Sequence, residues 1–259
     1  MSQPEAKRQK TDDGEYELIY WPGIPGRGEF IRLLFEDSGT PYKDTGKGDP
    51  SSAVSKVTSL TSSKGDAANP PVFAPPALRH GDDVLIHQTA NIMMYLAPKV
   101  GLAPTDLVAL YHLNAIALTL LDGLSDEVHE THHPIATGQY YEDQKPEAKK
   151  RAKAFTEERL PKFLAYVQRV LDGEKSGEGP WLYGGECSYV DLVLFQGIDG
   201  TQFAFPKAMA KMKGSGKYDG VFKLYDAVKE RPNIKAYLAS DRRAEYSEGI
   251  WRHYPELEE

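Results

Sequence analysis

The sequence predicts two domains, a small α/β domain at residues 16–98 and an all-helical domain at residues 104–245. Three observations lead to this prediction. Strand-like and helix-like segments alternate in the first part of the chain, only helical patterns follow in the second, and a segment with proline at both ends, Pro98–Pro104, separates them. The polar residues 1–15 are expected to be a disordered tail, and residues 246–259 a C-terminal tail.

The α/β domain is expected to begin with a strand at residues 16–21, YELIYW, which are rich in aromatic and branched side chains. A loop rich in glycine and proline follows, and apolar residues at helical spacing then predict a helix that Gly39 ends. A second short strand is predicted at residues 40–44. The next stretch is rich in Ser and Lys and is expected to hold one short helix near residues 51–60.

The last part of the α/β domain predicts two strands around a turn at residues 80–83. A helix from Gln88 to Pro98 follows, because proline cannot continue the helical hydrogen bonds. The predicted order is therefore β-α-β-(α)-β-β-α, which is the order of a thioredoxin-like domain.

The helical domain is expected to begin with long helices at residues 105–131 and 146–171, the second kinked or broken by Pro161. A third helix has a clear start signal, with Ser188 as N-cap and Asp191 three residues later, as in a capping box. Two shorter helices are expected near the end of the chain, at residues 218–229 and 232–240.

The composition narrows the functional classes. The chain has 259 residues and a formal net charge of −7, which argues against a nucleic-acid binder. No apolar run is expected to approach the roughly 18 residues of a membrane span, and the N-terminus lacks the apolar segment of a signal peptide. The single cysteine, Cys187, fits a reducing, cytoplasmic location.

Two motifs point to other chemistries. The loop G-I-P-G-R-G, residues 23–28, lacks both the dinucleotide-binding spacing and the Lys-Ser/Thr of a P-loop, so nucleotide binding is not expected. The segment HETHH, residues 129–133, satisfies H-E-x-x-H, in which His129 and His133 would hold zinc with Glu130 as base. Because Pro134 follows at once and no clear third ligand stands downstream, no metal site is predicted.

Four segments together resemble the cytosolic glutathione transferases of the tyrosine-type classes Mu, Pi and Sigma. They are LIYWPGIPGRGEFIRLLFEDSGTPY, PPALRHGDDVLIHQTANIMMYL, GGECSYVDLVLF and VKERPNIKAYLAS, and the likeness extends over about residues 16–240. The resemblance implies the glutathione-transferase fold, glutathione as co-substrate, a hydrophobic small-molecule electrophile, a homodimer and a role in detoxification.

The resemblance also assigns the catalytic residues. Tyr20 matches the tyrosine whose hydroxyl donates a hydrogen bond to the glutathione thiolate, and Arg27 matches an arginine near the thiolate. A helix start near Arg27 adds positive potential at the same place.

The glutathione-binding residues are implied by the second matching segment. Pro76 matches the family's cis-proline, and Gln88 and Thr89 match the pair that binds the γ-glutamyl end. Pro75 stands where the family has Val or Leu, and because proline has no N–H, only its carbonyl is left to bond the glutathione cysteine.

Further binding residues are less tightly defined. The family holds the glycyl carboxylate with a tryptophan and a lysine between the second and third strands. No tryptophan lies between Pro41 and Pro76 here, and Lys56 and Lys64 are both candidates for the lysine; we predict Lys64. The remaining side chains are Trp21 and Tyr111, as walls of an apolar pocket, and Asp122, near where some classes supply an acid across the dimer interface.

The leading prediction is thus a glutathione transferase. Two alternatives stay open: a non-catalytic ligand-binding protein of the same fold, favoured by Pro75 and the missing tryptophan, and a glutathione-dependent isomerase or ether-cleaving enzyme.

Overall fold

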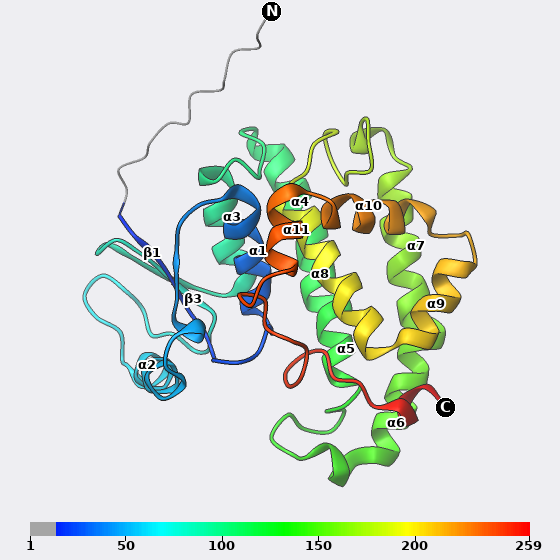
Figure 1. Cartoon of the computed structure of the whole chain (residues 1–259), viewed down its shortest axis with the longest axis horizontal. Helices are drawn as coiled ribbons and strands as arrows, with labels where there is room; N and C mark the ends of the chain where they lie inside the picture. The colour runs from blue at the N-terminus through cyan, green and yellow to red at the C-terminus, as the bar shows by residue number, and fades with distance from the viewer. Residues whose placement is uncertain (1–13) are drawn as a thin grey trace, which may run out of the picture.

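The structure is a computed structural model that describes residues 14–259, so the predicted tail lies almost wholly outside the described residues. Figure 1 shows a small sheet with its helices on one side of the molecule and a larger group of helices on the other. The four-stranded sheet has the order β2-β1-β3-β4. The predicted combination of a thioredoxin-like domain and an all-helical domain is confirmed.

The sheet is mixed. Strand β1 (Tyr16–Ile19) pairs in parallel with β2 (Lys43–Asp44) and antiparallel with β3 (Ala77–His80), which pairs antiparallel with β4 (Val84–His87). Strand β1 ends two residues earlier than predicted, because the Tyr20 N–H leaves the ladder and donates to the Thr45 hydroxyl at 3.1 Å.

Helices cover both faces of the sheet, as the alternation of side chains in a strand requires. Leu18 and Leu78 belong to the main core together with residues of α1 (Gly28–Ser38) and α3 (Thr89–Lys99). On the opposite face, Ile19 and Ala77 form a smaller cluster with Val57 of α2 (Pro50–Ser62).

The predicted helix at residues 105–131 is one continuous helical stretch. It consists of α4 (Leu107–Leu118), a π-helical segment (Thr119–Ser125) and α5 (Asp126–Glu130). This stretch is apolar and long enough to cross a membrane by length and composition, which corrects the expectation that no segment would be. Its buried side packs in the domain core beside α8, so its length and apolar composition are also those of a core helix.

The predicted helix at residues 146–171 contains the expected irregularity. Helix α6 (Lys145–Ala154) passes through a π-helical segment (Phe155–Arg159) into α7 (Leu160–Leu171). Pro161 stands in the first turn of α7, where its missing N–H does not interrupt a regular ladder.

The central helix of the second domain is α8 (Tyr189–Ala204), which begins at the predicted capping box, with the Ser188 N–H donating to Asp191 Oδ2 at 2.7 Å. The helices that follow are α9 (Pro206–Gly214), α10 (Asp219–Lys229) and α11 (Pro232–Leu238). Helix α9 was not predicted, because its sequence is rich in lysine and buries only Met209. Short 3-10 segments complete the chain, at Thr45–Lys47, Tyr141–Gln144, Glu174–Ser176 and Pro255–Glu258.

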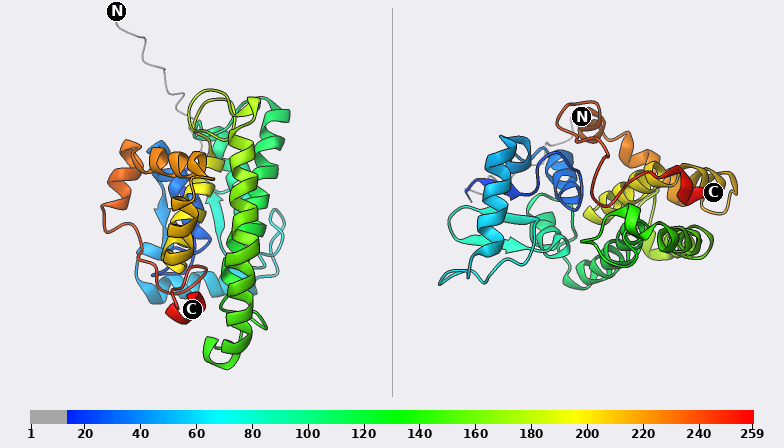
Figure 2. Two further views of the ribbon diagram at one scale, coloured as in Figure 1. Left: turned by 90° about the vertical axis from the view of Figure 1, so that its right-hand side faces the viewer. Right: turned by 90° about the horizontal axis from the view of Figure 1, so that it is seen from below.

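The last residues of the chain are not a free tail, contrary to the expectation for residues 246–259. After α11 the segment crosses from the sheet domain to the end of α6, as Figures 1 and 2 show. Trp251 is 1% exposed and packs on Gly200 of α8, where a Cβ would lie 2.3 Å from the indole. The C-terminal segment is therefore part of the core.

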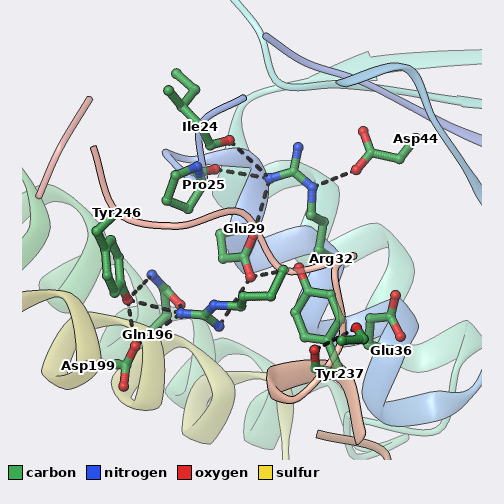
Figure 3. Close-up of polar contacts among 12 residues, drawn as sticks. Ile24, Pro25, Glu29, Arg32, Glu36, Asp44, Gln196, Asp199, Tyr237 and Tyr246 are labelled. Carbon is green, nitrogen blue, oxygen red and sulfur yellow. Dashed lines mark hydrogen bonds and ion pairs between the residues drawn. The ribbon is translucent and has the colours of Figure 1, made fainter. Parts of the chain in front are cut away.

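A buried network of charged and polar groups joins α1 to the end of the chain (Figure 3). The Glu29 carboxylate is fully buried and accepts from the Tyr237 hydroxyl at 2.8 Å. It also pairs with Arg32 and with Arg243, each at 3.2 Å. Buried charges are tolerated only when paired in this way, so the network fixes α1 against the C-terminal segment.

Candidate functional site

The loop after β1 is closed tightly over the side chain of Tyr20. A Cβ at Gly26 would lie 2.3 Å from the Tyr20 hydroxyl oxygen, and one at Gly28 would lie 2.7 Å from the ring. Gly26 also has a φ of +45°, which glycine adopts without strain. Gly26 and Gly28 are therefore required, because the backbone passes directly against the phenol.

The Tyr20 hydroxyl is held by the start of α1. It accepts a hydrogen bond from the Arg27 N–H at 2.8 Å. Burial raises the pKa of Tyr20 against the opposing effect of this hydrogen bond, so the phenol stays protonated at neutral pH. Within residues 14–259 the hydroxyl donates to no protein group, which leaves its hydrogen free to donate to a ligand.

Arg32 holds the loop after β1 in place through the loop's backbone carbonyls. Its guanidinium donates to the carbonyl of Pro25 at 3.1 Å and to that of Ile24 at 3.4 Å, and pairs with Asp44 at 2.6 Å, as Figure 3 shows. Burial alone would lower the pKa of Arg32, but the neighbouring carboxylates raise it, so the charge is kept. Sequence reasoning missed this positioning residue, although an arginine within the apolar run FIRLLF was a usable signal.

Arg27 lies at the N-cap of α1 and reaches into the helical domain. Its guanidinium forms an ion pair with Asp126 at the start of α5. Burial raises the pKa of Asp126, although the positive charge of Arg27 acts in the opposite direction. The predicted catalytic arginine therefore carries an interdomain ion pair beside Tyr20.

The register of the sheet places the predicted glutathione-binding residues next to Tyr20. Ile19 pairs with Ala77, and Ala77 pairs with His87. The residues one step beyond these pairs are Tyr20, Pro76 and Gln88, which therefore stand side by side at one end of the sheet.

Each of these neighbours has a distinctive backbone or side chain. The Pro75–Pro76 peptide bond is cis, as expected for Pro76. Gln88 is exposed and has a φ of +73°, a strained conformation of the kind found at ligand sites. Thr89 is 2% exposed, begins α3, and has a hydroxyl without a hydrogen-bond partner among the described residues. An unpaired hydroxyl at a helix N-terminus suits a ligand carboxylate.

The other predicted site residues lie farther from this group. Trp21 packs on the small cluster beneath α2. Lys64 is exposed beyond the end of α2, and Lys56 pairs with Glu17 at 2.6 Å. Tyr111 is 53% exposed on the outer face of α4, and Asp122 is exposed three turns later. Their assigned roles stay predictions.

The C-terminal segment borders the same loop. A Cβ at Gly249 would lie 3.8 Å from the Ile24 side chain and 4.0 Å from the Gly26 Cα. The following residue, Ile250, is 6% exposed and its carbonyl is hydrogen-bonded to His132 of the helical domain at 3.0 Å. The space beside the Tyr20 loop is therefore walled by both the helical domain and the end of the chain.

Comparison with known proteins gives a consistent result. A family profile described as "Glutathione S-transferase, C-terminal domain" matches residues 129–241. The chain is 29% identical over 225 residues to "Glutathione S-transferase P" of Caenorhabditis elegans, covering 86% of this chain and 91% of the relative. It is 25% identical over 229 residues to a glutathione S-transferase of Dirofilaria immitis, covering 86% of this chain and 92% of that protein.

Solved structures share the fold. The Pi-class glutathione S-transferase of Onchocerca volvulus matches with a TM-score of 0.63 and 22% identity, covering 86% of this chain and 92% of that one. The glutathione S-transferase from Ascaris lumbricoides matches with a TM-score of 0.62 and 22% identity, covering 87% and 96%. The profile, the relatives and the shared fold together support the prediction of a cytosolic glutathione transferase, a family of enzymes.

Proposed function

We propose that the protein conjugates the glutathione thiolate to a hydrophobic electrophile, with the Tyr20 hydroxyl stabilising the thiolate. The observation that carries the proposal is the state of that hydroxyl. It is protonated, fixed by the Arg27 N–H at 2.8 Å, and free to donate its own hydrogen.

The expected effect of one such hydrogen bond is large enough for catalysis. A free thiol has a pKa near 8.5 and is mostly protonated at neutral pH. A hydrogen bond to a charged group contributes about 1.5–3 kcal/mol, and one pKa unit corresponds to about 1.4 kcal/mol. The hydroxyl therefore lowers the thiol pKa by about one to two units, because it stabilises only the ionised form.

The rest of the glutathione molecule would extend along the end of the sheet. Thr89 offers its unpaired hydroxyl and the start of α3 to the γ-glutamyl carboxylate, with Gln88 beside it. Pro75 presents a carbonyl but no N–H to the cysteinyl backbone. We assign the glycyl carboxylate to Lys64.

Arg27 adds positive potential near the sulfur. Because Asp126 pairs with it, only part of that charge acts on the thiolate. Its contribution is therefore expected to be smaller than that of Tyr20.

A second function is favoured by the C-terminal segment. Gly249 lies against Ile24 and Gly26, so the chain itself takes up space beside the Tyr20 loop. In a non-catalytic binding protein this segment would close over a ligand, whereas in a transferase it would limit the electrophile to small molecules.

The active form is proposed to be a homodimer in the cytoplasm, with a role in detoxification. Helix α4 exposes an apolar stripe, and Phe73 on the loop before β3 is 86% exposed. The stripe consists of Leu107, Val108, Tyr111 and Leu118. Exposed apolar surface of this kind is typical of an association site. Sedimentation of the wild type against Phe73→Ser tests this, and a wild-type monomer would contradict it.

The catalytic proposal is tested with a generic aromatic halide as electrophile. Tyr20→Phe removes the hydroxyl but keeps the ring, so kcat/KM is expected to fall by about 10- to 100-fold, and the pKa of bound glutathione to rise by about one to two units. The thiolate is followed by its ultraviolet absorbance. Unchanged activity in Tyr20→Phe would exclude this role, and tight glutathione binding without turnover by the wild type would favour the binding protein.

A further inference from the structure

Three histidines gather where the long helix of the second domain ends. His129, His132 and His133 are spaced i, i+3 and i+4, which places them on one side of a helical turn. The turn stays tight beyond α5, because the His132 N–H donates to the His129 carbonyl at 3.3 Å. The ring centroids are 4.8–5.4 Å apart, and one ring nitrogen from each residue lies within 4.8 Å of the others.

The three imidazoles are available as neutral ligands. Burial lowers the pKa of His129 to about 4 and that of His132 to about 3, and it also lowers the pKa of His133. A neutral imidazole has one nitrogen with a free lone pair, which is the form that binds a metal ion.

His132 shows which of its nitrogens carries the lone pair. The side chain is 1% exposed, and its Nε2 lies 3.0 Å from the Ile250 carbonyl oxygen, which can only accept. Nε2 must therefore carry the hydrogen. The other nitrogen, Nδ1, is buried and has no partner among the described residues. A ring that donates one N–H to a backbone carbonyl and keeps the opposite lone pair free has the arrangement of a metal ligand.

The contact between His133 and Gln144 does not use up the third lone pair. The Gln144 amide nitrogen lies 3.4 Å from His133 Nδ1, but its two hydrogens have closer acceptors. These are the carbonyls of Ala136 at 3.1 Å and Gln139 at 3.2 Å. His133 also has a hydrogen bond with the Gln139 backbone, so one of its two nitrogens is left for a metal ion.

The charges around the cluster are compatible with a cation. Arg252 lies close enough to lower the pKa of all three histidines, but it pairs with Glu248 at 2.7 Å. Glu130, the base that an H-E-x-x-H hydrolase would need, is instead paired with Arg151. The cluster thus offers ligands without that catalytic base.

We propose that His129, His132 and His133 bind one divalent transition-metal ion of the zinc class. Imidazole is a preferred ligand of such ions. Zn–N bonds of about 2.0–2.1 Å place the nitrogens of a tetrahedral site roughly 3.3 Å apart, so side-chain rotation must close the longest separation by about 1.5 Å. Since His129 and His133 are only partly buried, solvent reaches the cluster and supplies the fourth position.

The third ligand is the one that the sequence pattern did not provide. In the H-E-x-x-H pattern the third ligand is expected downstream, whereas here the third ligand, His132, lies between the two histidines of the motif. The site also ties the end of α5 to the C-terminal segment through Ile250, so metal binding is expected to stabilise that segment. This proposal does not depend on the transferase function.

The test uses the full-length, metal-free protein without a histidine tag. Titration with Zn²⁺ should show one equivalent bound, and Co²⁺ should give the visible spectrum of a four-coordinate site. His132→Ala should weaken Zn²⁺ binding by about 100-fold. His112→Ala, an exposed histidine on α4, is the matched control and should bind like the wild type.

A double variant, His129→Ala with His133→Ala, covers the case that His132→Ala fails to fold, because it removes only partly buried rings. No saturable binding by the wild type would overturn the proposal. Equal Zn²⁺ affinity in the double variant and the wild type would overturn it as well. Metal binding and glutathione conjugation are measured separately, so neither result decides the other.

Discussion

Two ionic contacts on the same short stretch of α1 join the two domains, and they differ in their exposure. The Glu29 network is enclosed, with Glu29 fully buried and Arg243 10% exposed at its side chain. The Arg27–Asp126 pair lies two residues earlier and is 29% and 40% exposed. A buried pair is costly to break because one charge is left without water, whereas an exposed pair contributes little. The first contact is therefore expected to contribute more to the stability of the domain interface than the second.

The largest expected effect is on the buried side. Arg243→Ala should lower the free energy of unfolding by about 3–5 kcal/mol, because it removes one of the two cations that pair with the buried Glu29 and the cation that pairs with Asp199. Denaturant unfolding measures this loss. The neighbouring Arg242→Ala is the control, since Arg242 is 54% exposed and pairs with Glu36, so it should cost about 0–1 kcal/mol. Similar losses in the two variants would show that burial does not distinguish these contacts.

The next effect concerns the glycine loop that precedes both contacts. Gly26→Ala should reduce kcat/KM by at least about 10-fold, because its Cβ would displace the Tyr20 hydroxyl. Gly23→Ala is matched in conformation, with a φ of +74° and nothing within 4 Å of a Cβ. Backbone strain should cost about 1–2 kcal/mol of stability in each variant. The clash with Tyr20 adds to this cost in Gly26→Ala alone, and only that variant should lose activity. Loss of activity in both would mean that backbone strain, not contact with Tyr20, is responsible.

The smallest effect is expected on the exposed side. Arg27→Ala should change the free energy of unfolding by no more than about 1 kcal/mol, because the ion pair is partly screened by water. Its kcat/KM should fall by about 2- to 5-fold, from the loss of positive potential near the thiolate. Steady-state kinetics and denaturant unfolding of the same preparation separate the two. A stability loss as large as that of Arg243→Ala would remove the contrast between the two contacts.

A second contrast, between near and distant neighbours, separates the Tyr20 hydroxyl from the His132 ring. The Tyr20 hydroxyl is fixed by neighbours within eight residues of it, so its geometry was readable from the loop motif. Which nitrogen of His132 keeps its lone pair is decided by Ile250, 118 residues away, whose carbonyl accepts the hydrogen of the other nitrogen.

The amino-acid sequence by itself determined the local architecture. Apart from α9, the order of strands and helices follows from signals between residues close in the chain, as do the Ser188 capping box and the glycine-rich turn after Tyr20. Such signals act through backbone conformation and hydrogen bonds within one turn, so they can be identified from the sequence without a structure. The residues of the candidate site were predicted from the family resemblance, and the register of the sheet brings Tyr20, Pro76 and Gln88 together at the ends of adjacent strands.

Only the tertiary structure decided the contacts between distant segments. It assigned Arg32 to the loop carbonyls, paired Arg27 with Asp126, and packed Trp251 under α8 in place of a free tail. It also completed the histidine cluster with His132. The physical reason is the same in each case. Whether a polar group is paired, buried or free depends on what the folded chain brings against it, and the neighbours concerned lie up to 118 residues apart in the sequence.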